Sequence, residues 1–289
     1  MLYHPKRNSV IMIQILVLTG LLLVVLIIMS IRLKRQVVQQ RQLREDAEES
    51  RRQMITEQKR NQQLKQEMTS NIAHELKTPV SSIRGYLEIL LGDKPVDEQQ
   101  RQYFLERCYT QTLRLSELIA DVALINKLEE ANDLFIKEPV NVSDCADEAI
   151  EELSHSISQH NMTIENNLPP SIIINGDRFL LYTIFRNTIE NSTMHAGDGC
   201  KIVLDCYKDF DGTFYYLRVF DTGVGVGNEY LPKLFDRFLR IDEGRSRKNG
   251  GSGLGLSIVK HAVQLHGGEV YAKNRQEGGL EILFSLRKE

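Results

Sequence analysis

The chain contains few of the residues that mark a secreted, a disulfide-stabilised or a zinc-binding protein. It has no tryptophan, and its four cysteines form no Cys-x-x-Cys pair. Scattered cysteines of this kind favour reduced thiols in a cytosolic environment. None of the seven histidines belongs to a His-Glu-x-x-His pair, so nothing in the sequence indicates a zinc site. The net charge of −3 likewise gives no reason to expect direct nucleic-acid binding.

Charged residues are missing from one long stretch near the N-terminus. Residues 9–31 carry no charge, and Gln14 is their only strongly polar side chain. A transmembrane helix needs about 20 apolar residues, so this stretch is long enough to span a membrane. A cleaved signal peptide is the alternative, but its apolar part would be about 7–15 residues long and would end at small residues. Here the stretch runs directly into Arg32, which favours a retained anchor.

The charges on either side of this helix predict its orientation. Several basic residues follow it before the first acidic residue, Glu45, whereas only Lys6 and Arg7 precede it. Because basic flanks stay inside, we expect a single-pass protein of the plasma (inner) membrane, with the part of the chain that follows the helix in the cytoplasm. Residues 1–8 would then form a short extracytoplasmic end, too small for a sensor domain. Whether a separate membrane protein supplies the sensor stays open.

The next stretch lacks the residues that break helices. Neither proline nor glycine occurs between Arg32 and Met68, and Gln, Arg, Glu and Lys dominate. This composition predicts a long helical linker over residues 32–65. A heptad frame fits the linker, but half of its seam positions are polar, so we expect a weak coiled coil. A solvated single helix is the alternative.

Residues 66–132 predict a helical hairpin. Asp97 follows a turn and is a suitable N-cap for a second helix that ends near Glu130. The residues expected on the buried faces are Ile72, Leu76, Ile83, Leu87 and Leu90 in the first helix, and Phe104, Cys108, Leu115, Ile119, Val122 and Leu128 in the second. A lone hairpin leaves one apolar face uncovered, so we expect a homodimer that forms a four-helix bundle.

Residues 139–289 have a different pattern, in which short strands and helices occur in mixed order. This order predicts an α+β sandwich. Ser143 is the expected N-cap of its first helix. The expected strands lie near residues 140, 162–165, 172–174, 202–207, 215–220, 269–273 and 280–286, and the expected helices at about 143–159, 177–194 and 253–265. The fold class is thus multidomain, with a transmembrane helix, a helical hairpin and an α+β domain.

The hairpin carries the heptapeptide Ala73-His-Glu-Leu-Lys-Thr-Pro79. It resembles the phosphoacceptor motif of the sensor histidine kinases of bacterial two-component systems. The resemblance implies that His74 accepts a phosphoryl group, that Glu75 is the general base, and that Thr78 orients the water that dephosphorylates a partner response regulator. The chemistry needs an exposed, neutral imidazole, because a protonated ring has no lone pair for phosphorus.

Four motifs in the second domain extend the resemblance to the end of the chain. Asn187 and Asn191 are one helical turn apart, and the resemblance implies that Asn191 is a Mg²⁺ ligand, as its amide oxygen suits that ion. Asp221 is followed by Gly223 and Gly225, and the resemblance assigns Asp221 to the adenine amino group. The implied fold is the Bergerat-type ATP-binding sandwich, with ATP and Mg²⁺ as the small molecules it uses.

The other two motifs flank an expected ATP lid at about residues 226–250. Phe235 and Phe238 resemble the phenylalanine-rich box that anchors this lid, and Arg240 matches an arginine that reaches the phosphates. The last motif resembles the second glycine box of the family, whose backbone N–H groups at a helix start would bind phosphate. Its residues are Gly251, Ser252, Gly253, Leu254 and Gly255.

The sequence departs from the family pattern just after Asn191. The resemblance leads us to expect Lys or Arg followed by Tyr, where this chain has Met194 and His195. A missing cation near the phosphates predicts weaker ATP binding or slower transfer. A phosphatase-biased homologue with weak autokinase activity is therefore an alternative to a full kinase. A plain ATPase and a non-enzymatic membrane scaffold are further alternatives.

Overall fold

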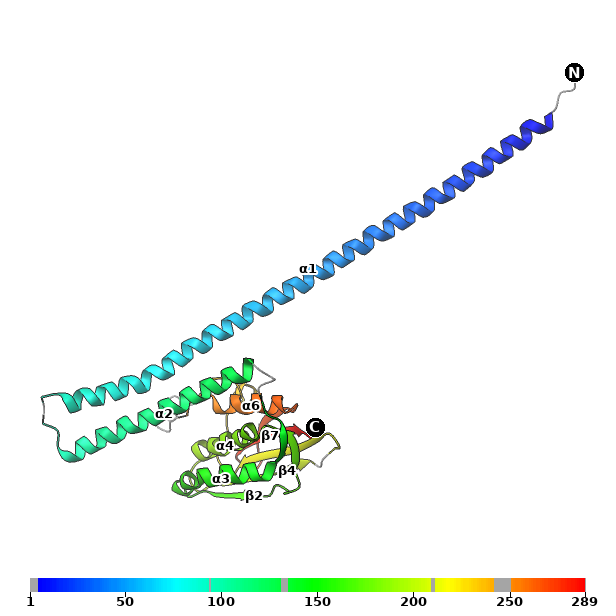
Figure 1. Cartoon of the computed structure of the whole chain (residues 1–289). Coiled ribbons are helices and arrows are strands. Elements are labelled where there is room, and N and C mark those ends of the chain that lie inside the picture. Colours follow the sequence, from blue (N-terminus) through cyan, green and yellow to red (C-terminus); the bar gives the residue numbers. More distant parts are fainter. Residues whose placement is uncertain (1–4, 94, 131–134, 209–210, 242–250, 289) are drawn as a thin grey trace. The chain divides into compact units, whose positions relative to one another are not determined.

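The structure is a computed structural model of the chain that describes residues 5–93, 95–130, 135–208, 211–241 and 251–288. The chain forms two compact units, Met1–Glu67 and Met68–Glu289. The first unit is helical, and the second contains a helical hairpin and a mixed α+β domain (Figure 1). The expected fold class is confirmed in these parts.

Helix α1 (Pro5–Leu91) includes the expected anchor and the expected linker. Among the described residues, Leu16–Gln36 is the one helical segment that is long and apolar enough to cross a membrane. It overlaps the expected span at residues 9–31. Its large apolar side chains are exposed, as those of a lipid-facing helix are, and Leu16 and Leu18 are each 75% exposed. The helix continues without a break through residues 32–65.

Helix α2 (Glu98–Glu130) pairs with the last part of α1 to form the hairpin (Figure 1). The backbone N–H of Gln100 donates to Asp97 Oδ1 at 2.7 Å, so Asp97 caps α2 as expected. Tyr86 and Phe104 stack between the two helices with ring centroids 5.6 Å apart. Phe104 was expected on this inner face, whereas Tyr86 was not.

Two of the apolar residues expected on that inner face lie elsewhere. Ile119 is 55% exposed and Leu87 is 40% exposed, so their expected burial is wrong for the single chain. Successive helical residues point about 100° apart. Because Leu118 and Ile125 of α2 face the core of the second unit, Ile119 is turned away from that core.

The α+β domain has three helices on one face of a five-stranded sheet (Figure 1). The sheet order is β2-β4-β5-β7-β6, in which only the β2–β4 pair is parallel, and β1 pairs with β3 beside it. The helices are α3 (Val142–Gln159), α4 (Arg178–His195) and α6 (Gly255–Leu265), with a short 3-10 helix at Leu231–Lys233. The strands are β1 (Glu138–Asn141), β2 (Thr163–Asn166), β3 (Ile173–Gly176), β4 (Lys201–Lys208), β5 (Phe214–Asp221), β6 (Val270–Asn274) and β7 (Leu280–Arg287).

Helix α3 begins earlier than the sequence predicted. Its N-cap is Asn141, whose side chain accepts a hydrogen bond from the Ser143 N–H, so the assignment of Ser143 as the cap is wrong. Strand β1 runs directly into α3, and its last residue therefore does the capping. Asn and Ser cap helices about equally well, so residue type alone does not distinguish Asn141 from Ser143.

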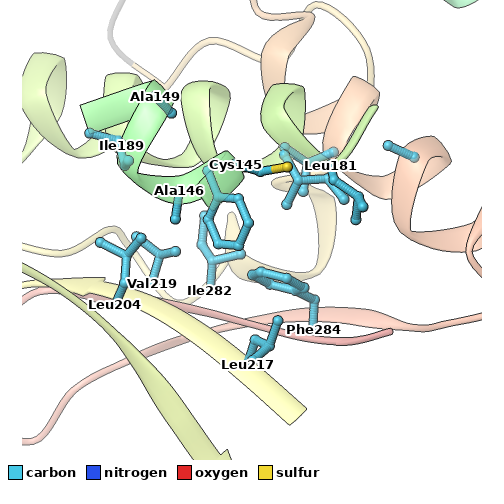
Figure 2. Close-up of a cluster of buried hydrophobic side chains, with 14 of the residues drawn as sticks. Cys145, Ala146, Ala149, Leu181, Ile189, Leu204, Leu217, Val219, Ile282 and Phe284 are labelled. Atoms are coloured by element: carbon cyan, nitrogen blue, oxygen red, sulfur yellow. The ribbon is translucent and has the colours of Figure 1, made fainter. Parts of the chain in front are cut away.

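The core lies between the three helices and the inner face of the sheet (Figure 2). Alternate residues of β5 and β7 point inward, as the two-residue period of a strand requires. Phe185 of α4 meets Phe284 of β7 edge to face, with ring centroids 5.9 Å apart. Figure 2 shows the helix residues Cys145, Ala146, Ala149, Leu181 and Ile189 packed over Leu204, Leu217, Val219, Ile282 and Phe284 of the sheet.

A buried histidine links α6 to the start of α4. His266 Nε2 accepts the Asp177 N–H at 3.0 Å, and its Nδ1 lies 2.7 Å from the Ala262 carbonyl oxygen. This pair of bonds requires the neutral ring with its proton on Nδ1. Burial lowers the pKa of His266 below its ordinary value of 6.5. The unfolded chain therefore binds this proton more readily than the folded chain does.

We expect the melting temperature of the purified chain to fall as the pH drops below about 6.5, because protonating His266 breaks the Asp177 contact. His266→Gln should flatten this dependence, whereas replacing the exposed His155 by Gln should leave it intact. Thermal unfolding followed by circular dichroism between pH 5 and 8 measures both. Equal slopes in His266→Gln and the unmodified chain would contradict this account.

Candidate functional site

His74 stands on the exposed side of the hairpin. Its side chain is 73% exposed, and its Nδ1 lies 3.9 Å from Glu75 Oε1. That distance is longer than a hydrogen bond, so the two groups are neighbours without being bonded. The Thr78 hydroxyl, one helical turn further on, bonds to the backbone carbonyl of His74 at 3.3 Å. The imidazole is thus accessible to a reactant, with a carboxylate and a hydroxyl beside it.

Two arginines converge on Glu75. Arg240 Nη1 lies 3.2 Å and Arg114 Nη2 lies 3.7 Å from Glu75 Oε2. Burial and the neighbouring Arg240 charge lower the pKa of Arg114. The family resemblance implied that Arg240 reaches the phosphates, but in this structure Arg240 forms an ion pair with Glu75, the expected general base. Arg114 was missed, since one arginine in an amphipathic helix belongs to no motif.

The two asparagines lie on the inner side of α4. Asn187 is buried and donates to the Thr183 carbonyl, while Asn191 is half-buried one turn later. A Cβ atom at Gly255 would lie 2.8 Å from Asn187 Oδ1. Only glycine lets the start of α6 approach α4 this closely. The structure thereby brings the asparagine motif and the second glycine box together.

Asp221 ends strand β5 in a buried position, with only 2% of its surface exposed. Its Oδ1 accepts the backbone N–H groups of Gly223 at 2.9 Å and Leu280 at 3.2 Å. Its Oδ2 accepts the Ser192 hydroxyl at 3.2 Å. A Cβ at Gly223 would lie 2.2 Å from the Ala196 carbonyl oxygen, so the turn after Asp221 fits against α4 only with glycine there.

The phenylalanine-rich segment contacts the second glycine box. Phe235 and Phe238 are half-buried against the core. The Phe238 N–H donates to the Gly253 carbonyl at 2.8 Å. Gly253 has a positive φ of 71°, which a residue with a side chain rarely adopts. The expected polar part of the lid, residues 243–250, lies outside the described residues.

The glycine box also touches the hairpin. Asp121 of α2 accepts the Ser252 hydroxyl at 2.9 Å, and burial raises the pKa of Asp121. Burial likewise raises the pKa of Glu190 on α4, with the Arg186 charge acting in the opposite direction. Ser252 accepts the Leu254 N–H as well, at 3.2 Å, which shapes the loop before α6. No sequence pattern singles out Asp121, because this contact exists only once the hairpin has packed.

These residues fit a purine nucleotide. Glycines 223, 253 and 255 let the backbone approach closely where a side chain would intrude. The first turn of α6 offers backbone N–H groups that have no acceptor within the helix, together with the positive end of the helix dipole. Both favour phosphate binding. Asp221 supplies a buried hydrogen-bond acceptor near the C-terminal end of α4. The exposed imidazole of His74 belongs to the same compact unit.

Two family models match the chain in succession. Residues 64–131 match the His Kinase A (phospho-acceptor) domain. Residues 176–289 match the histidine kinase-, DNA gyrase B- and HSP90-like ATPase. The first match contains His74, Glu75 and Thr78, and the second contains the asparagine, aspartate and glycine motifs.

Curated relatives match most of this chain and are longer than it. The sensor histidine kinase WalK of Bacillus subtilis (strain 168) is 29% identical over 232 residues, which cover 80% of this chain and 38% of the relative. The sensor protein kinase WalK of Staphylococcus aureus is 28% identical over 233 residues, covering 80% of this chain and 56% of the relative. This chain therefore spans less than two thirds of the length of either relative.

Solved structures share the fold at low sequence identity. The Acinetobacter baumannii histidine kinase AdeS has a TM-score of 0.60 and 21% identity over 75% of this chain and 98% of its own. Histidine kinase ThkA, solved in complex with the response regulator protein TrrA, has a TM-score of 0.61 and 22% identity over 77% of this chain and 61% of its own. The motifs, the two domain matches and the fold agree, and the chain belongs to the sensor histidine kinases of two-component systems.

Proposed function

We propose that this chain transfers the γ-phosphoryl group of ATP to His74 and then to an aspartate of a response regulator receiver domain. One observation carries the proposal above all. A single compact unit contains an exposed histidine on a phospho-acceptor hairpin. The same unit contains the buried Asp221 carboxylate, which could accept a purine amino group, and the glycine-rich start of α6. A plain ATPase does not need the exposed histidine, and a membrane scaffold needs neither the histidine nor the nucleotide-binding groups.

The two ring nitrogens of His74 would have different roles. Nδ1 is the nitrogen nearest Glu75, so Nε2 would be the nucleophile. Nε2 attacks the γ-phosphorus, the bond to the bridging oxygen breaks, ADP leaves, and the Nδ1 proton is accepted by Glu75. Arg240 would neutralise phosphate charge during transfer, which requires its present contact with Glu75 to open.

The nucleotide would lie between α4, the end of β5 and the start of α6. Asp221 would accept the adenine amino group, and the backbone of residues 251–255 would hold the phosphates. A Mg²⁺ ion bound through the Asn191 amide oxygen, with phosphate oxygens and water as its other ligands, would neutralise charge that develops on the leaving group. A histidine kinase of this fold, ShkA, has been solved in complex with AMPPNP, at 24% identity and a TM-score of 0.55.

Two further properties follow for the whole protein. We place the chain in the plasma (inner) membrane through the apolar segment Leu16–Gln36, with the kinase part in the cytoplasm. We also expect a homodimer, because the hairpin exposes apolar side chains that no described part of this chain covers. These include Val80, Ile89, Leu105, Leu113 and Ile119.

Phosphotransfer to a panel of receiver domains tests the proposal. The full chain in nanodiscs is labelled with γ-labelled ATP and Mg²⁺, freed of nucleotide, and mixed with each purified receiver domain of its host. We expect rapid loss of label from the chain and its gain by one or two receivers. Thr78→Ala should leave that transfer intact and slow the later loss of label from the receiver. A chain that takes up no label but still dephosphorylates a receiver would favour the phosphatase-biased alternative.

Met194 stands where the family resemblance leads us to expect a cation. Met194→Lys should bind ATP about three- to tenfold more tightly, because a lysine one turn from Asn191 would add an attractive charge near the phosphates. Phe179→Lys, which adds the same charge at an exposed position near the other end of α4, should leave the affinity unchanged. Isothermal titration calorimetry measures all three. Unchanged or weaker ATP binding by Met194→Lys would show that the lack of a basic residue at position 194 does not limit the affinity of this chain for ATP.

A further inference from the structure

Ser192 lies at the base of the nucleotide site, although no motif includes it. It is 5% exposed on the inner side of α4, directly after Asn191. Its hydroxyl donates to Asp221 Oδ2 at 3.2 Å, across 29 residues of sequence. Other buried hydroxyls of α4 bond instead to carbonyl groups of their own helix, as Thr188 and Thr193 do. Ser192 is thus turned toward the carboxylate and not toward the helix backbone.

The remaining contacts of Asp221 determine what this bond can do. A carboxylate has about four acceptor positions, two on each oxygen. Both positions on Oδ1 are used by the N–H groups of Gly223 and Leu280. A Cβ at Gly279 would lie 3.0 Å from the same oxygen, so the backbone closes that side. With Ser192 on Oδ2, one acceptor position remains on the whole carboxylate.

We propose that Ser192 is a specificity-determining positioning residue, which fixes Asp221 so that its one open acceptor position selects a purine with an amino group at C6. The inference deepens the proposed function and rests on it. Adenine offers an N–H donor at C6 and completes the carboxylate. Hypoxanthine and guanine carry a carbonyl oxygen there, which would face the carboxylate as a second acceptor without a proton between them.

Removing the hydroxyl would loosen this selection in two ways. The carboxylate would lose the bond that holds Oδ2 in place, so its hydrogen bond to adenine would weaken. A second acceptor position would also open, with the space of the lost hydroxyl beside it. A water there could donate one proton to Oδ2 and the other to a C6 carbonyl oxygen, which would make hypoxanthine acceptable.

The test compares ATP with inosine triphosphate, which differs from ATP only at C6 and in the proton on N1. Dissociation constants are measured by calorimetry on the full chain in nanodiscs. In Ser192→Ala we expect ATP to bind about tenfold more weakly while inosine triphosphate keeps or gains affinity, so that the preference for ATP falls by about tenfold or more. Ser192→Cys keeps the shape with a weaker donor and should give an intermediate preference.

The control is Thr193→Val, which deletes a buried hydroxyl of the same helix that faces away from Asp221. It should bind both nucleotides as the unmodified chain does. Equal weakening of both nucleotides in Ser192→Ala, or an unchanged preference, would overturn the role of Ser192 while leaving the kinase proposal standing. If the unmodified chain binds neither nucleotide, the proposed function fails first and this inference fails with it.

Discussion

His74→Gln should take up no label from γ-labelled ATP, a loss of at least about a thousandfold relative to the unmodified chain. Glutamine keeps a polar side chain of similar reach but offers no lone pair of comparable nucleophilicity to phosphorus. His74 is 73% exposed, so the substitution should leave folding unaffected. Autoradiography after denaturing electrophoresis measures the label.

Two controls separate loss of the acceptor from loss of the site. His155→Gln makes the same change at an exposed position on α3 and should label normally. His74→Gln itself should still bind ATP with the affinity of the unmodified chain, because the proposed nucleotide contacts come from α4, β5 and α6. Normal labelling of His74→Gln would place the phosphoryl group on another residue and remove the hairpin from the reaction.

Asp221→Asn should weaken ATP binding by about a hundredfold, which corresponds to about 2.7 kcal/mol. Asp221 accepts from donors on both of its oxygens, whereas an amide has one oxygen and one NH₂ group. If the amide oxygen faces Gly223 and Leu280, the NH₂ group faces the adenine amino group, donor against donor. The opposite orientation would set the NH₂ group against two backbone N–H groups.

The matched control is Asp205→Asn on the neighbouring strand β4. Asp205 pairs with Arg218, and its side chain lies on the outer face of the sheet, away from the helices. It should bind ATP as the unmodified chain does, even if its melting temperature falls. Calorimetry and thermal unfolding on both variants distinguish a lost ligand contact from a general loss of stability. Tight ATP binding by Asp221→Asn would show that Asp221 does not bind the adenine base.

Local patterns predicted the elements of the second domain to within a few residues. Helical spacing was sufficient for α2 and α4, and Asp97 caps α2 as its position indicated. The choice between Asn141 and Ser143 was missed, because it depends on how far β1 extends before α3 begins. The exposure of Ile119 was also missed, because it depends on which face of α2 meets the core.

The motifs of the candidate site could be predicted from the sequence. The contacts between motifs that lie far apart in the sequence could not. Asn187 meets Gly255 and Phe238 meets Gly253 as a consequence of the fold, although the residues are far apart in sequence. The contacts of Glu75 with Arg240 and of Asp121 with Ser252 depend on how the hairpin packs on the α+β domain. No periodicity or spacing reports such packing. Ser192 was missed for the same reason, since its importance comes from the carboxylate it meets.

The chemical nature of the bound phosphate tests the central claim most directly. The full chain in nanodiscs is incubated with γ-labelled ATP and Mg²⁺, and the labelled protein is then held in acid or in base. A phosphoryl group on imidazole nitrogen is lost in acid and kept in base, and peptide mapping should place it on His74. Label that survives acid, as a phosphoserine or phosphothreonine ester does, or a complete lack of label under these conditions, would contradict the account.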